Sequence, residues 1–73
     1  MSYRKVEMSD SSGNVIRRDI TCATDFEARA LYKKWISECK GVHGQIAKRH
    51  NDAVGLIYIT VFEDNYAVKL IFY

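Results

Sequence analysis

The sequence predicts an α+β fold, an antiparallel sheet of four to five strands with one helix packed on one face, in the order ββαβββ. Residues 24–40 carry apolar side chains at the spacing of an amphipathic helix. The segments on both sides alternate or are rich in β-branched and aromatic residues, and short polar segments join them as hairpins. Seventy-three residues suffice for one domain, which we expect to span residues 1–73.

The predicted helix runs from Thr24 to Lys40. Thr24 followed by Glu27 is a capping-box pattern at its start. Gly41 is expected to end it by entering the left-handed backbone region. One face collects apolar residues, with Val42 following just past the end: Ala28, Leu31, Tyr32, Trp35, Ile36 and Cys39. This face must be buried.

Two alternating segments before the helix, residues 3–8 and 15–22, are expected to pair as a hairpin through the polar connection 9–14. The apolar side of the second segment carries Ile16, Ile20 and Cys22. Arg18 falls on the same side, so we expect it at the sheet edge, where its long stem can reach solvent.

After the helix, residues 45–50 are a weak strand candidate, and residues 56–62 and 66–73 are expected to form a hairpin through the turn 63–65. The side expected to meet the helix carries Ile57, Ile59, Val61, Val68, Leu70 and Phe72. The other side carries Leu56, Tyr58, Thr60, Phe62, Lys69, Ile71 and Tyr73. Since a solvated sheet face normally carries polar residues, this composition predicts cover by a second copy of the chain or by a partner protein.

The sequence offers little chemistry. Cys22 and Cys39 each fall on an apolar face, so we interpret both as reduced core residues. With His43 and His50 they lack the spacing of a zinc site. Cys39, His43 and Asp52 are the residue types of a nucleophilic site, but a thiolate is disfavoured on the buried face of a helix. We therefore expect no enzymatic activity, no metal and no cofactor.

Charge and hydropathy narrow the function classes further. A net charge of +2 is too small to require nucleic-acid binding, so the positions of the charges matter more than their sum. Residues 1–8 lack the apolar run of a leader, and no stretch is long enough to span a bilayer. Both observations predict a cytoplasmic protein.

Positive charge and tyrosine mark the candidate binding surfaces. Arg29, Lys33 and Lys40 form a stripe on the predicted outer face of the helix. This stripe is either an ordinary solvated surface or a patch that contacts acidic protein or phosphate. Tyrosines on the outer side of the sheet indicate an interface. The candidate partner-binding residues are Arg17, Arg29, Lys33, Lys40, Lys48, Arg49, Tyr58, Lys69 and Tyr73.

Two stretches, Ala23-Thr24-Asp25-Phe26-Glu27-Ala28 and Val42-His43-Gly44-Gln45-Ile46, carry a resemblance to a family of very small phage-encoded inhibitors. The layout is similar to that of a type I-F anti-CRISPR protein of ββαβββ order, and the front half also resembles a small phage inhibitor of bacterial RNA polymerase. The tail, residues 66–73, is more apolar than in either. The resemblance implies a non-enzymatic protein that occupies a surface of a host complex, which in the anti-CRISPR case is the surface used to reach target DNA.

Three hypotheses follow. The leading one is a small binding protein of phage or mobile-element origin that inhibits a host protein or ribonucleoprotein complex, with host RNA polymerase or another host-takeover target as a variant. The second is a basic nucleic-acid-binding module. The third, compatible with the first, is a homodimer formed through the outer side of the C-terminal hairpin.

Overall fold

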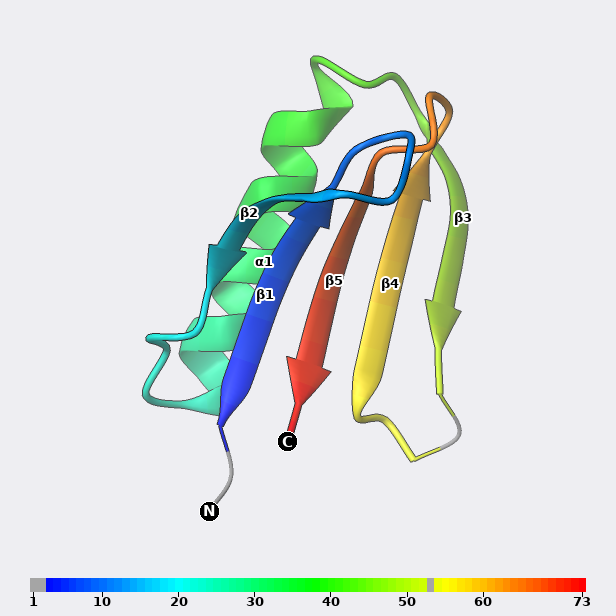
Figure 1. Ribbon diagram of the computed structural model, residues 1–73. Helices are drawn as coiled ribbons and strands as arrows, with labels where there is room; N and C mark the ends of the chain where they lie inside the picture. Colours follow the sequence, from blue (N-terminus) through cyan, green and yellow to red (C-terminus); the bar gives the residue numbers. More distant parts are fainter. Residues whose placement is uncertain (1–2, 53) are drawn as a thin grey trace.

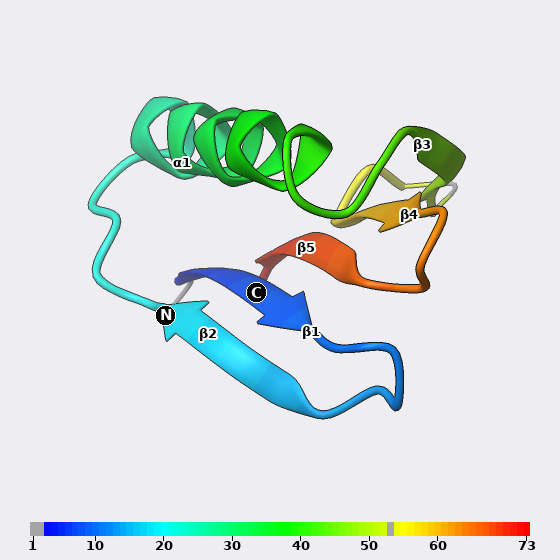
Figure 2. The same cartoon turned by 90° about the horizontal axis from the view of Figure 1, so that it is seen from above.

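The computed structural model of the chain describes residues 3–52 and 54–73. The elements follow the order β1 (Arg4–Ser9), β2 (Val15–Asp19), α1 (Asp25–Lys40), β3 (Ile46–Asn51), β4 (Ile57–Phe62) and β5 (Ala67–Phe72). The strands form one antiparallel sheet in the order β2-β1-β5-β4-β3, and α1 crosses one of its faces (Figures 1 and 2). The predicted α+β fold of ββαβββ order is confirmed.

The capping box at the start of α1 is formed as predicted. The Glu27 N–H donates to Thr24 Oγ1 (3.1 Å), and Glu27 Oε2 accepts from the Ala23 N–H (2.8 Å). The end of α1 differs, because Gly41 stays in right-handed backbone (φ −80°) and Gly44 is the residue with positive φ (84°). The N–H groups of residues 42 and 43 both donate to the Cys39 carbonyl, which turns the chain away from the core and leaves Val42 75% exposed.

The buried face of α1 packs mainly over β1, β5 and β4. The predicted face is confirmed for Ala28, Trp35, Ile36 and Cys39, which are buried, and for the half-buried Leu31 and Tyr32. The sheet side of this core consists of Val6, Met8, Phe62, Val68 and Leu70. Burial on this scale is the main stabilising contribution in so short a chain, at roughly 25 cal/mol per Å² of apolar surface.

The prediction for β4 is wrong by one residue. Thr60 and Phe62 are 1% and 0% exposed beneath α1, whereas Ile57, Ile59 and Val61 lie on the open face of the sheet. The turn is the reason, because the Phe62 N–H donates to the Tyr66 carbonyl (2.8 Å) and thereby sets the register of the whole hairpin. Even-numbered residues of β4 then lie opposite even-numbered residues of β5 and share their face.

The prediction for β2 is reversed at its isoleucines, whereas Cys22, which follows the strand, is half-buried against the core. Arg17 lies opposite Met8 and therefore on the helix side, where its guanidinium is 4.2 Å from the centroid of the Trp35 ring and donates to Glu38 (2.9 Å). Ile16 and Ile20 are 53% and 55% exposed. β2 is an edge strand, as expected from Arg18, and a long cation covers more of the tryptophan ring there than a short aliphatic side chain could.

Candidate binding groove between α1 and β3

A groove separates α1 from the edge strand β3, with β4 as its floor. Figure 2 shows α1 and β3 rising side by side above β4, because the sheet curls toward the helix at this edge. The groove has a volume of about 360 Å³. The residues that border it are Tyr32, Lys33, Ile36, Arg49, His50, Asn51, Tyr58, Ile59 and Thr60. His50 and Ile59 lie opposite each other, and their side chains are on the other face of the sheet.

The floor of the groove is closed by one hydrogen bond between hydroxyl groups. Tyr32 Oη lies 2.7 Å from Thr60 Oγ1, joining α1 to β4. Burial raises the pKa of Tyr32, while the hydrogen bond to Thr60 and the positive charge of Arg49 act in the opposite direction. The groove therefore presents a neutral phenol at physiological pH.

Two cations line the groove, and a third lies next to it. Lys33 and Arg49 line it from opposite walls. The Arg29 guanidinium lies one helical turn before Lys33, 5.2 Å from the centroid of the Tyr58 ring and 5.1 Å from that of the Phe72 ring. The contacts with these two rings hold the Arg29 side chain beside the groove. Its position therefore depends on aromatic rings and not on an ion pair with a carboxylate.

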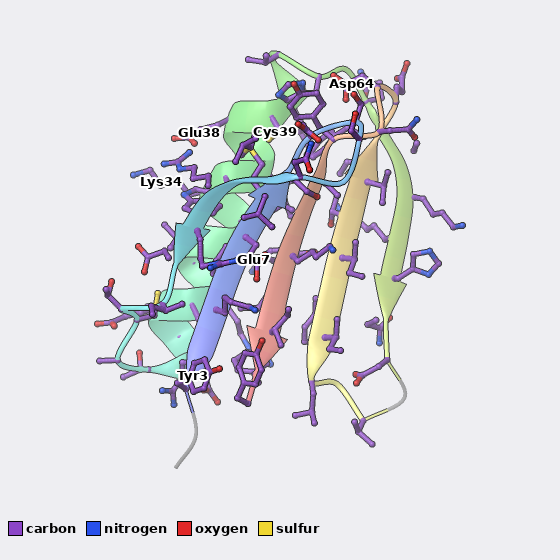
Figure 3. The ribbon with its side chains drawn as sticks, in the orientation of Figure 1. Tyr3, Glu7, Lys34, Glu38, Cys39 and Asp64 are labelled. Carbon is purple, nitrogen blue, oxygen red and sulfur yellow. The ribbon has the colours of Figure 1, made fainter. Side chains whose placement is uncertain are left out.

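Charge is unevenly distributed between the two flanks of α1. Helical periodicity places Arg29, Lys33 and Lys40 on the flank that faces β3. The opposite flank, nearer β2, carries Lys34 and Glu38 (Figure 3), and Glu38 binds Arg17. The stripe predicted for the outer face of the helix thus lies beside the groove instead of pointing straight into solvent.

The basic residues of this flank have no acidic partner. In residues 3–52 and 54–73, every Asp and Glu side chain accepts a hydrogen bond from a cation, a histidine or a backbone N–H group. Arg4, Lys5, Arg17 and Arg18 are the cations in ion pairs with carboxylates. The cations without such a pair in this part of the chain are Arg29, Lys33, Lys34, Lys40, Lys48, Arg49 and Lys69.

The structure brings together some of the nine candidate residues and separates others. Lys33, Arg49 and Tyr58 line the groove, Arg29 contacts the Tyr58 ring beside it, and Lys40 continues the Arg29–Lys33 flank at the end of α1. The others lie elsewhere: Lys48 opposite Val61 on the other face of β3, Lys69 and Tyr73 on the open face of the sheet, and Arg17 at the β2 edge.

Six residues of the groove were not among the sequence candidates: Tyr32, Ile36, His50, Asn51, Ile59 and Thr60. Tyr32 and Ile36 were expected to be wholly core residues, and Thr60 was placed on the wrong face of β4. The sequence indicates a role in the groove only through the positions of Tyr32 and Ile36, which lie on the side of the apolar face nearer Lys33. A residue on that side can pack on the sheet and still border a groove.

The open face of the sheet has a different character. Ile57 lies opposite Ile71, and Val61 lies opposite Ala67. Tyr3 stacks on Tyr73 with ring centroids 4.2 Å apart. Glu7, which projects from the centre of this face (Figure 3), binds Lys5 at 2.6 Å and lies between Arg18 and Lys69 on the neighbouring strands. This open face is the surface predicted for a homodimer. Its β4 residues are Ile57, Ile59 and Val61, whereas the prediction had placed Tyr58, Thr60 and Phe62 there.

The nucleophile-type residues are not brought together. His43 Nδ1–H donates to Asp64 Oδ2 at 2.6 Å, and the His43 ring stacks on Tyr66, so His43 joins the end of α1 to the β4–β5 turn. Asp52 follows β3 at the opposite end of the sheet (Figure 1). Burial opposes ionisation of Asp64, but hydrogen bonds from the Tyr66 N–H and His43 outweigh it and lower its pKa. Burial raises the pKa of the Cys39 thiol.

Within the described residues, no three His, Cys, Asp or Glu side chains lie close enough to hold a metal ion, and no helix is both long and apolar enough to cross a membrane. Comparison with known protein families, with curated proteins and with solved structures finds no match. The geometry and charge of the groove are therefore the basis for inferring the function.

Proposed function

We propose that this chain is a small non-enzymatic binding protein that inhibits a larger host complex by covering an anionic part of its surface with the α1–β3 groove. The observation that carries the proposal is a set of cations without carboxylate partners among the described residues: Lys33 and Arg49 line the groove, and Arg29 lies next to it on the Tyr58 ring. A partner that supplies the missing anions would neutralise this charge in a partly desolvated site.

The arrangement of Arg29 and Lys33 favours such a partner. Like charges one helical turn apart destabilise a helix by about 0.2–0.5 kcal/mol. An anion bound between them removes that repulsion and adds charge-assisted hydrogen bonds. The apolar walls, Tyr32 and Ile36, add burial to the charge contacts, which is the usual composition of a protein-binding groove.

The inhibitory role and its setting rest on the resemblance to small phage-encoded inhibitors. A chain that offers a docking groove without an assembled reactive centre acts by occupying a surface, as that resemblance implies. The cytoplasm is the proposed location, in keeping with two free cysteines, Cys22 and Cys39.

Direct binding of nucleic acid is the competing function, and the aromatic residues of the groove favour protein instead. The Tyr58 ring is approached by Arg29 and packs edge-on against Phe72, with centroids 6.2 Å apart. The Tyr32 hydroxyl is bound to Thr60. Arg29 and Phe72 thus already occupy part of the Tyr58 ring surface on which a base would stack.

The test is affinity capture of host proteins from nuclease-treated bacterial lysate by the tagged chain, with quantitative mass spectrometry. Lys33→Glu reverses a charge in the groove, and Lys34→Glu makes the same change on the opposite flank of α1. We expect a protein or complex that the wild type and Lys34→Glu capture and Lys33→Glu loses. If the three chains capture the same proteins, or if capture disappears with nuclease treatment, the proposal is wrong.

A further inference from the structure

We propose that the partner contributes an extended acidic segment that adds to the sheet as a sixth strand alongside β3, with alternate side chains entering the groove. This inference rests on the proposed function and specifies how the groove is used. Three features of the described residues carry it: the backbone of the β3 edge, the charge of β3, and the contrast with the other edge of the sheet.

The outer edge of β3 presents free hydrogen-bonding groups. Across β3 and β4, the Asp52 N–H donates to the Ile57 carbonyl at 3.0 Å. In an antiparallel pair, successive residues alternate between facing the partner strand and facing away. Counting back from Asp52, the N–H and C=O groups of Asn51 and Arg49 point away from β4, at the margin of the sheet. Two such residues can exchange up to four hydrogen bonds with an added strand.

The positive charge of β3 favours an added strand that carries negative charge. Lys48, Arg49 and His50 follow one another, so both faces of β3 carry basic side chains. An added strand places its side chains directly opposite these, where opposite charges stabilise and like charges destabilise the pair. A second copy of β3 is therefore disfavoured, which is how charged edge strands normally prevent self-association. An acidic strand is favoured in either register.

The other edge of the sheet differs, because its cations are already paired. β2 also carries two consecutive cations, but Arg17 is held by Glu38 and Trp35, and Arg18 lies 3.8 Å from Glu7. The Arg17 side chain bridges β2 to α1 at this point. At β3 no such bridge is present among the described residues, so side chains of an added strand can pass between β3 and α1.

The groove supplies the contacts for those side chains. Side chains on the helix side of the added strand meet Arg49 and, across the groove, Lys33, while Ile36 and Tyr32 line the space between α1 and β4. This favours a segment that alternates carboxylate and aliphatic residues. The chemistry expected of the partner is thus an extended, proline-poor acidic segment.

The probe is a fluorescein-labelled peptide of about eight residues, the length of an ordinary strand, that alternates glutamate and valine. Binding is measured by fluorescence anisotropy at low ionic strength. Asn51→Pro removes one outward N–H group without a loss of hydrogen bonding to β4, and Asn51→Ala keeps that group as the matched control. Lys33→Glu tests the groove itself, and thermal unfolding monitored by circular dichroism checks that each variant is folded.

We expect the peptide to bind the wild type and Asn51→Ala alike, and to bind Asn51→Pro and Lys33→Glu at least about fivefold more weakly. A peptide with alternate N-methylated residues, which keeps its charge and loses its donors, should not bind. If Lys33→Glu weakens binding while Asn51→Pro and N-methylation do not, strand addition is wrong and the proposed function stands. If a lysine-valine peptide binds equally well, or if no variant alters binding, the anionic groove is wrong too.

Discussion

The hydrogen bond on the floor of the groove gives the sharpest energetic prediction. Tyr32→Phe leaves the Thr60 hydroxyl, in a residue 1% exposed, without its partner. An unsatisfied buried hydroxyl costs about 1–3 kcal/mol. Thr60→Val leaves the Tyr32 hydroxyl without its partner, but Tyr32 borders the groove and its hydroxyl can be hydrated. The loss of unfolding free energy in Thr60→Val should therefore be nearer to about 1 kcal/mol.

The double variant Tyr32→Phe/Thr60→Val removes both hydroxyl groups. Replacing both partners of a hydrogen bond by apolar groups changes the free energy of unfolding very little. The two single changes should therefore be non-additive, with a coupling energy of about 1–2 kcal/mol. Each 1 kcal/mol corresponds to a shift of about 4–8 °C in Tm for a chain of this length. Urea unfolding followed by the fluorescence of Trp35 measures all four corners of the cycle.

A second cycle provides the control. Tyr58 lies on the same strand as Thr60 but no hydrogen bond joins the two side chains, so Tyr58→Phe and Thr60→Val should be additive within about 0.5 kcal/mol. A coupling energy below about 0.3 kcal/mol in the Tyr32–Thr60 cycle would refute the assignment of this hydrogen bond, because pairs without contact couple no more strongly than that.

Three further predictions concern the fold. Phe62→Ala should destabilise the chain by about 3–5 kcal/mol and Ile59→Ala by only about 1 kcal/mol, since only the former opens a cavity in the core; equal losses in urea unfolding would contradict the observed face of β4. Arg17→Ala should cost about 1 kcal/mol and shift the fluorescence of Trp35 to the red by hydrating its ring, and an unchanged spectrum would contradict that contact. Because the pKa of Asp64 is lowered in the folded chain, its carboxylate stabilises the fold fully above pH 3.8, the ordinary pKa, and this contribution is lost as the pH falls through the folded pKa. The urea midpoint of unfolding should therefore decrease on acidification, and it should decrease less in Asp64→Asn. Equal decreases in the two chains would contradict this role of Asp64.

The fold was predictable where local signals agree with one another. The capping box at Thr24 and the apolar periodicity of residues 24–40 fix α1 independently of the sheet. The polar connection 9–14 and the turn 63–65 each follow from turn chemistry, and Asn65 adopts the positive φ (69°) that asparagine tolerates. Together these signals leave little freedom in the order of the elements.

The sequence contained enough information to predict which side of β4 is buried, but the hydropathy of the strand residues indicated the wrong side. Ile57, Ile59 and Val61 are more aliphatic than the alternate set, which contains Thr60. A three-residue turn after Phe62 nevertheless pairs even-numbered with even-numbered residues, and the face of β5 was assigned correctly. The buried hydroxyl of Thr60 is tolerated because Tyr32 satisfies it, which hydropathy does not register.

The groove was not predictable in the same way. Its basic residues could be named, but their convergence depends on the curl of the sheet and on where the axis of α1 crosses it. Neither is encoded by local pattern. The exposure of β2 had the same origin, since a strand at the edge of a small sheet receives cover from α1 only where a long side chain such as Arg17 reaches it.

Amide hydrogen exchange of the chain with and without the glutamate–valine peptide tests most directly the claim that the groove is the docking surface. We expect protection to increase at the N–H groups of Arg49 and Asn51 and along the β3-facing flank of α1. The N–H of His50, already directed toward β4, should change little. Protection confined to the open face of the sheet around Ile71, or to β2, would contradict the assignment of the groove as the docking surface.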